Sequence, residues 1–520
     1  MSIFSKVATT KIPSNDFRDL TYNNKFDAQL GLLYPVHVEE IVPGDIFYAG
    51  HGAMIRTQPM VTPVMQNFRY NIRWFFVPNR LIWENFESFI TDQEKGKSDL
   101  GSNHVHPYLT GKNPIDYLHD LLGIPVIDPS SPFSPDDFVN AGLPVNALPF
   151  RAYNLIWNEY FRDQNLDDAS DVSLGDGPDI VDYHLLPVSW KKDYFTSALP
   201  FAQRGDAVQL LGTVVYNNPD HNYQNYVDPA TGAPLAVLGD AVFNRDNNGN
   251  VHLYSEESPN SEIANMDPNG TLQAAVEFSA IRRANAIQKF LEKSAVGGNR
   301  YSELLLAHFG VRSSDASLQR PQYLGGGSAP INVTPVEQNS STDAVSPQGN
   351  LAGKGVGVGS MFMNKRTLFT EHGWLLGLAF IRPDADYHQG LRRQMVKYDR
   401  FDYYWHYFQN IGEQEIHNWE IFADLNDGDL KDSFGYQSRY AEYKWHGNEI
   451  HGQFRKALRS WVAPRWFTQM PTLSSDFVHV DLNIAPNMAV SPDEFPPFMV
   501  EALNVVHARR PMYYFNRGTL

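Results

Sequence analysis

The stretch that decides the fold reads Asn67-Phe68-Arg69-Tyr70-Asn71-Ile72-Arg73-Trp74-Phe75-Phe76-Val77. Polar and apolar residues alternate through Ile72, so that Phe68, Tyr70, Ile72 and Trp74 share one face, as a half-buried strand requires. Pro78 follows and ends the strand, because proline cannot donate to the hydrogen-bond ladder. Residues 45–78 as a whole predict two long strands, of which this is the second.

Further elements are predicted outward from this strand by apolar periodicity. The helical segments form apolar stripes at 80–90, 115–122, 150–162, 277–296 and 301–308. The strand-like segments are 373–381, 476–482 and 498–507. Elements this short, separated by Pro and Gly, favour a mainly β protein with long connections.

Two stretches predict irregular structure. Residues 325–359 are rich in Gly, Ser, Asn and Pro, and we interpret them as a long loop. Residues 1–30 are polar and show no clear period, which predicts an N-terminal arm that becomes ordered on contact with neighbours. A frayed terminus is the alternative for this segment.

The composition sets the class of protein. The chain has 520 residues, 42% of them apolar and 13% aromatic, with 34 Pro and 37 Gly. It has no cysteine, which excludes disulfides, zinc–thiolate sites and thiol nucleophiles and indicates folding in a reducing cytoplasm. Residues 1–10 lack a signal-peptide core, and no apolar run approaches the ~18 residues of a membrane span.

Charge is distributed unevenly along the chain. The net charge is −17, which argues against a general nucleic-acid binder. Residues 160–275 contain 17 acidic and 5 basic residues, whereas residues 436–520 contain 7 acidic and 9 basic residues. An acidic middle and a mildly basic end predict a protein with two different faces.

The stretch from about 205 to 270 differs from the rest of the chain. Turn signals such as Asn247-Asn248-Gly249-Asn250 recur between short β-like runs at 210–216, 235–238 and 251–254. This pattern predicts an inserted surface excursion with its own small hairpins.

No catalytic, cofactor or metal site is predicted. The glycine-rich stretch 349–359 has the wrong spacing for a phosphate loop. Neither His104 with His106 nor His446 with His451 has the spacing and third ligand of a zinc site. The tripeptide that begins at Arg204 matches an integrin-recognition motif, which we attribute to chance.

The C-terminal tail, about 508–520, is the strongest candidate for a binding site. Its cations can neutralise phosphates and its rings can stack on unpaired bases, as single-strand binding requires. These residues are Arg509, Arg510, Tyr513, Tyr514, Phe515 and Arg517. Packing of the tail on a neighbouring subunit is the equally weighted alternative.

Several long phrases resemble the major capsid proteins of gokushoviruses, small single-stranded-DNA bacteriophages of the family Microviridae. The resemblance covers nearly the whole chain, in the right order. The phrases are Trp74 to Phe86, Leu148 to Arg162, Asp193 to Pro200, Phe309 to Arg312 and Gln319 to Gly326. They are long and rich in aromatic residues, so that chance is a poor explanation.

The resemblance implies one jelly-roll capsid domain over 1–520: an eight-stranded antiparallel β-sandwich with long interstrand loops. It implies a non-enzymatic protein that assembles with itself into a T=1 icosahedral shell around circular single-stranded DNA, without a cofactor. Implied partners are small basic DNA-binding proteins, minor capsid or pilot proteins and a host surface receptor. The implied locations are the virion and, during assembly, the host bacterial cytoplasm.

The family carries a variable insertion that forms a protrusion at the threefold axes, and the stretch 205–270 lies where it should fall. We therefore expect these residues to contribute to host attachment. The candidate host-facing residues are Tyr216, Tyr223, Tyr226, Asn247 and Asn248.

Two other classes of protein remain alternatives from the residues alone. A jelly-roll carbohydrate-binding module could use exposed aromatic rings to stack on sugars, and would stay a monomer or small oligomer. A glycan-cleaving enzyme would need two paired carboxylates, but the sequence singles out no pair.

Overall fold

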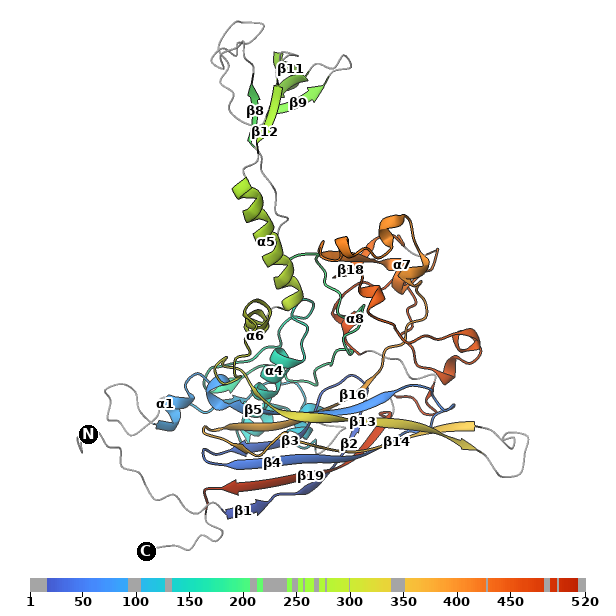
Figure 1. Cartoon of the computed structure of the whole chain (residues 1–520). Helices are drawn as coiled ribbons and strands as arrows, with labels where there is room; N and C mark the ends of the chain where they lie inside the picture. Colours follow the sequence, from blue (N-terminus) through green and yellow to red (C-terminus); the bar gives the residue numbers. More distant parts are fainter. Residues whose placement is uncertain are drawn as a thin grey trace, which may run out of the picture. The chain divides into compact units, whose positions relative to one another are not determined.

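The computed structural model describes most of the chain (Figure 1). The described residues are 16–91, 104–126, 133–205, 213–217, 241–245, 251–255, 258–265, 271–275, 278–298, 300–337, 351–426, 429–480, 487–492 and 495–512. The contacts divide the chain into two units, one formed by residues 1–202 and 294–520 and the other by residues 203–293.

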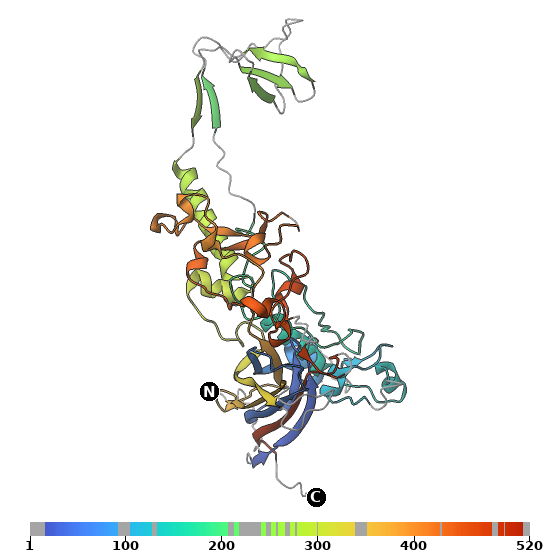
Figure 2. The ribbon, with the colours of Figure 1, turned by 90° about the vertical axis from the view of Figure 1, so that its right-hand side faces the viewer.

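The first unit is built on one curled antiparallel sheet of ten strands (Figures 1 and 2). Eight strands follow the order β1-β19-β4-β14-β13-β5-β16-β3, while β2 pairs with β19 and β15 with β4. Their bounds are β1 Asp16–Asp19, β2 Tyr22–Ala28, β3 Tyr34–Ile41, β4 Ile46–Thr57, β5 Phe68–Pro78, β13 Gln322–Glu337, β14 Leu351–Phe362, β15 Thr367–Leu368, β16 Gly373–Pro383 and β19 Phe498–Arg510. The mainly β, jelly-roll-like fold is confirmed, with the strands joined in one sheet.

The strands β5 and β16 lie toward one end of the sheet, next to the edge strand β3, and are buried on both faces. Their inner face, with Ile72 and Trp74, contributes to the core enclosed by the curl. Their outer face packs against the helix α4 (Leu148–Tyr160), which contributes Phe150 and Ile156 to a second core. The strand predicted at 67–77 and the helix predicted at 150–162 therefore pack against each other on this part of the sheet.

The glycine-rich stretch corrects the prediction of a long loop at 325–359. Residues 338–350 lie outside the described residues. The residues before and after them form β13 and β14, two of the longest strands. In β14 the glycines Gly353, Gly355 and Gly357 face inward, and Val356 and Val358 face outward. A Cβ at Gly355 would lie 2.4 Å from Thr57, so the absence of side chains lets this strand approach its neighbours closely.

A smaller lobe follows β16 in the chain. It contains the two-stranded sheet of β17 (Glu413–His417) and β18 (Ser433–Ser438), the helices α7 (Asn418–Ile421) and α8 (Ser475–Val478), and its own aromatic core around Phe195 and Phe434. Figures 1 and 2 place it on the same side of the sheet as α4. The prediction of a strand at 476–482 is wrong for its first residues, because residues 475–478 form the helix α8. The Ser474 side chain caps this helix by accepting a hydrogen bond from the Phe477 amide.

Short elements complete the first unit. They are η2 (Asn79–Leu81), α1 (Phe86–Thr91), β6 (Tyr108–Leu109), α2 (Tyr117–Leu121), α3 (Pro135–Asn140), β7 (Pro178–Asp179), α6 (Tyr301–Leu304), η3 (Leu305–Phe309), η4 (Arg393–Met395), η5 (Arg400–Asp402), η6 (His406–Phe408), η7 (Ala441–Tyr443), η8 (Gly452–Arg455) and η9 (Arg459–Trp461). The helix predicted at 80–90 is thus two short helical turns. Among the described helices none is long and apolar enough to cross a membrane.

The second unit contains two small sheets. One has the strand order β11-β10-β9 and the other pairs β12 with β8. Their bounds are β8 Thr213–Asn217, β9 Ala241–Arg245, β10 Val251–Ser255, β11 Ser258–Asn265 and β12 Thr271–Ala275. The helix predicted at 277–296 is confirmed as α5 (Phe278–Gly297), and the boundary between the units falls within it. Small hairpins were predicted in this stretch. Of the predicted β-like runs, 210–216 overlaps β8 and 251–254 lies within β10, whereas 235–238 lies outside the described residues.

The predicted N-terminal arm is regular in its second half. β1 and β2 pair with β19, and Phe26 and Ala28 contribute to the enclosed core. The prediction of an arm does not fit residues 16–28, because buried and exposed side chains alternate toward the end of Tyr22–Ala28 and this segment forms a strand of the main sheet. Residues 1–15 lie outside the described residues.

Candidate assembly surfaces

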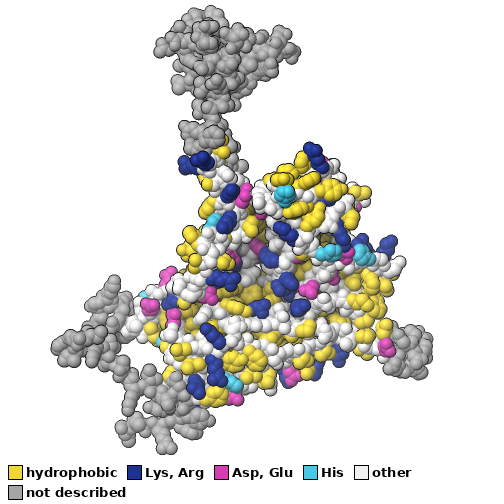
Figure 3. Space-filling view, viewed as in Figure 1, with side chains coloured by type: hydrophobic (Ala, Val, Ile, Leu, Met, Phe, Trp, Pro, Cys, Tyr) yellow, Lys and Arg dark blue, Asp and Glu magenta, His cyan; other side chains and the backbone are white. Residues whose placement is uncertain are grey.

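A loop between β16 and β17 exposes an unusual number of large apolar side chains. We call residues 395–411 the aromatic loop. Tyr407 is 76% exposed and Met395 72% exposed. The other exposed side chains of the loop are Tyr398, Phe401, Tyr403, Tyr404, Trp405 and Ile411. Figure 3 shows hydrophobic side chains gathered over the lobe that carries β18 and α7. A contiguous exposed patch of this kind marks a protein-binding surface.

The aromatic loop is held in shape by its own polar contacts. The carboxylate of Asp402 accepts from the amides of Tyr398 (2.6 Å) and Asp399 (3.1 Å), and the Trp405 indole donates to the carbonyl of Arg400 at 2.8 Å. The Tyr404 ring lies edge-on to Tyr440 at 5.0 Å, which ties the loop to the residues after β18. The rings are therefore presented outward by an ordered backbone, which lowers the entropy lost when a partner binds.

A cavity of about 470 Å³ lies beside the loop and is lined in part by Met395, Trp445 and Glu420. Burial raises the pKa of Glu420, against the effect of Arg393 at 2.8 Å. The Tyr194 hydroxyl also donates to this carboxylate, at 2.9 Å. Both contacts connect separate chain segments, so Glu420 stabilises the lobe that carries the loop.

A second uncovered surface is the outer face of β4, β14 and β19, which we call the outer sheet patch. Register places Val358, Met54 and Glu501 side by side, with Val356, Arg56 and Met499 in the adjacent row. Val358 is 66% exposed, and Phe362 stacks on Tyr48 at 5.9 Å. No described helix covers this face in the way that α4 covers β5 and β16, and its apolar side chains are exposed.

The predicted DNA-binding tail begins on this sheet, and its two described arginines behave differently. Arg509 is exposed on the outer sheet patch, while Arg510 points inward. Arg510 donates to Glu39 at 2.7 Å and lies 3.6 Å from Asp45, two carboxyls whose pKa burial raises. Arg510 therefore has a packing role within its own chain. The remaining tail residues, Tyr513, Tyr514, Phe515 and Arg517, lie outside the described residues.

The structure describes no side chain of the candidate host-facing residues. Tyr216 lies in β8, where the backbone alone is described, and Tyr223, Tyr226, Asn247 and Asn248 lie outside the described residues.

The histidines weighed as metal ligands have other contacts. His104 contacts Asp176 at 2.6 Å and His451 contacts Glu449 at 3.0 Å. Across the described part of the chain, no group of three or more His, Cys, Asp or Glu residues is arranged to hold a metal ion.

A curled antiparallel sheet with long ordered connections and two uncovered apolar surfaces defines a subunit of a protein shell. The chain belongs to the family described as "Capsid protein (F protein)", whose model matches residues 5–519. It is therefore a structural capsid protein and a component of a virion, not an enzyme.

Relatives named capsid protein VP1 support this identification, and all come from gokushoviruses. The protein of Bdellovibrio phage phiMH2K is 37% identical, over 92% of this chain and 91% of the relative. That of Chlamydia phage 1 is 32% identical, over 98% and 96%. That of Spiroplasma virus 4 is 29% identical, over 93% and 91%. Membership of the family sets aside the carbohydrate-binding and glycan-cleaving alternatives.

Proposed function

We propose that the chain assembles with itself into a T=1 icosahedral shell around circular single-stranded DNA, and that the aromatic loop forms contacts between copies. The ordered, outward-facing rings of this loop are the observation that carries the proposal. Burying aromatic rings supplies much of the energy of protein interfaces, and aromatic residues concentrate at their centres. A shell subunit needs such contacts on its flanks.

The outer sheet patch faces the packaged DNA in this proposal. It combines apolar side chains such as Phe362 with the cations Arg56, Lys354 and Arg509 on outward-facing positions. Rings and cations together suit single-stranded nucleic acid. The tail, 508–520, continues from the strand that carries Arg509.

The negative charge of the chain supports a role for basic partner proteins. A net charge of −17 cannot balance packaged phosphates. We therefore propose small basic DNA-binding proteins and minor capsid or pilot proteins as partners, with assembly in the host bacterial cytoplasm before release of the virion.

The segment 205–270 is the proposed threefold protrusion used in attachment to a host surface receptor. It lies within the separate unit 203–293, and hairpin strands recur through it. Deleting 205–270 should leave particles intact, remove surface protrusions from electron micrographs and abolish adsorption to the host.

The assembly proposal is tested by electron microscopy and sedimentation of the purified full-length chain with its phage partners. We expect uniform icosahedral particles, and we expect the double variant Trp405→Ser/Tyr407→Ser to remain as folded, unassembled subunits. Ile180→Ser is the control, since Ile180 is also exposed but lies in another segment. Normal particles from the double variant would contradict a role for the aromatic loop.

A further inference from the structure

A second cavity, also of about 470 Å³, lies on the outer side of β5 and β16. Six basic residues and two carboxylates line it. The basic residues are Arg73, Arg162, Lys191, Lys192, Arg300 and Arg382. Figure 3 shows Lys and Arg side chains gathered in the middle of the face between α6 and α8. The cavity therefore has an excess of positive charge within its own lining.

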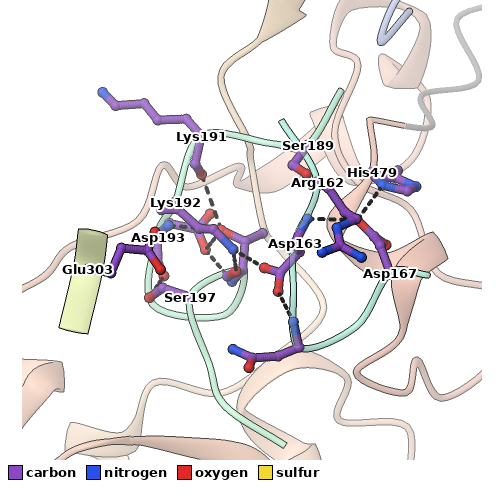
Figure 4. Close-up of polar contacts among 12 residues, drawn as sticks. Arg162, Asp163, Asp167, Ser189, Lys191, Lys192, Asp193, Ser197, Glu303 and His479 are labelled. Carbon is purple, nitrogen blue, oxygen red and sulfur yellow. Dashed lines mark hydrogen bonds and ion pairs between the residues drawn. The ribbon is translucent and has the colours of Figure 1, made fainter. Parts of the chain in front are cut away.

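The two carboxylates are already engaged. Asp163 pairs with Lys192, and Glu303 pairs with Arg300 at 3.1 Å. Figure 4 shows Asp163 turned toward Lys192, while the Lys191 side chain extends away from the cluster. Neither carboxylate is left to neutralise the other cations of the cavity.

Arg73 and Arg382 reach the cavity from adjacent strands and have carbonyls as partners. Arg73 donates to the carbonyls of Ile72 (2.9 Å) and Gly327 (3.1 Å), and Arg382 donates to the carbonyl of Ser189 at 3.4 Å. Arg382 also lies directly across from Arg69 in the sheet register. Burial lowers the pKa of Arg382, and Arg73 and Arg69 lower it further, while Asp384 partly offsets these effects. Like charges directly opposite in a sheet are destabilising unless an anion compensates.

Four buried donors around the cavity have no hydrogen-bond partner among the described residues. They are Arg162 Nε, Arg300 Nε, Ser189 Oγ and Trp190 Nε1. The Trp190 side chain is 2% exposed, so bulk water does not reach it freely. A buried donor without a partner destabilises the fold, and an occupant that accepts hydrogen bonds removes that cost.

We propose that this cavity binds a phosphate-class oxyanion, held by Arg162, Arg300 and Arg382 with Ser189 and Trp190 as neutral donors. Phosphate presents several acceptor oxygens and a negative charge, which match guanidinium forks and neutral donors at once. A free phosphate and the backbone of a DNA strand share this chemistry. The site is separate from the outer sheet patch and the tail, because α4 covers the outer face from which Arg73 and Arg382 extend.

The test uses the purified full-length chain, with Trp fluorescence and thermal melting as readouts at constant ionic strength. Inorganic phosphate replaces chloride in one arm, and a short oligothymidylate is added in the other. We expect saturable binding in at least one arm: saturation by phosphate alone identifies a free anion, and tighter binding of the oligonucleotide identifies a DNA backbone. Absence of saturable binding in both arms would overturn the proposal.

Arg162→Gln and Arg382→Gln should each weaken this binding about tenfold or more. The control Arg56→Gln removes a cation from the outer sheet patch and should leave phosphate binding within twofold. Without phosphate, Arg382→Gln should melt no lower than the unsubstituted chain, because it removes repulsion from Arg69 and Arg73. If Arg382→Gln unfolds the chain or both cavity variants bind phosphate normally, the arginines are structural and the proposal fails.

Discussion

The two halves of the main sheet differ in what covers their outer faces. Behind β5 and β16, α4 fills the outer face with large side chains, so both faces are buried within one chain. Behind β4, β14 and β19, apolar side chains such as Val358 stay exposed. Apart from the cavity beside Arg73 and Arg382, the first half is covered within its own chain, whereas the second half is left exposed. In this subunit, the residues that form the core are thus different from the residues that stay exposed on the sheet.

The largest expected effect compares the same substitution on the two outer faces. Phe75 packs against Tyr160 at 4.8 Å and Tyr323 at 5.5 Å, and Phe75→Ala should lower the free energy of unfolding by about 3–5 kcal/mol. Phe362→Ala should cost about 1 kcal/mol or less, because Phe362 is 42% exposed. Urea unfolding of unassembled subunits measures both. Equal losses would show that the two faces do not differ.

The inner face of the sheet predicts a dependence of stability on pH. Burial lowers the pKa of His37 to about 3 and that of His51 to about 4, so both stay neutral in the folded chain. The unfolded chain binds protons below about pH 6.5, where the folded chain does not. Stability should therefore be full above pH 6.5 and fall as the pH drops toward 4, by up to about 1.4 kcal/mol per pH unit for each histidine.

Thermal melting between pH 7 and pH 4.5 checks this dependence. His388 is a third buried histidine, whose pKa burial lowers to about 4. His51→Gln should therefore remove about a third of the histidine contribution to the slope below pH 6.5. An unchanged slope would mean that other groups cause the acid sensitivity.

Gly353 of β14 and Gly52 of the neighbouring strand β4 give a matched pair of substitutions. A Cβ at Gly353 would lie 2.7 Å from the carbonyl oxygen of Thr62 and from Cα of Pro63, both backbone atoms that cannot rotate away. Gly353→Ala should cost about 1–3 kcal/mol. Gly52→Ala, where the nearest atom is Ser360 Oγ at 3.5 Å, should change stability by less than about 0.5 kcal/mol. Chemical denaturation of both variants decides whether close approach of strands explains the glycines.

The last comparison separates two neighbouring arginines of β19. Arg510→Met should cost about 1–3 kcal/mol, because it leaves Glu39 without its ion pair. Arg509→Met should leave stability unchanged and weaken binding of single-stranded DNA severalfold, with a smaller salt dependence. Melting curves and filter binding distinguish the two. If both variants lose stability alike, the tail has a packing role alone.

Sequence predicted the half of the sheet that is rich in large apolar residues. The alternation in Phe68–Pro78 and the aromatic stripe of α4 reflect burial on both sides, which periodicity detects. β14 was missed because glycines occupy its inward positions and valines its outward ones, which inverts the usual signal. β13 was missed because its Gly325-Gly326-Gly327 run and its two prolines are loop signals, although Ala329 and Ile331 point into the core. Only the partner strands determine that Gly355 must lack a side chain.

The assembly surfaces were harder to predict than the fold. The aromatic density near 398–408 was visible in the sequence, but exposure depends on contacts distant along the chain, such as Tyr404 with Tyr440. The inward direction of Arg510 likewise depends on the register of β19 with β4, which no local pattern specifies. Composition identified the tail as basic without separating its structural arginine from its exposed one.

A cryo-electron microscopy structure of the assembled particle would show directly whether these surfaces form its contacts. We expect a closed icosahedral shell in which Trp405 and Tyr407 are buried against a neighbouring copy and Val358 faces the interior. A shell in which the aromatic loop stays in solvent, or in which the outer sheet patch forms the outside surface, would contradict it.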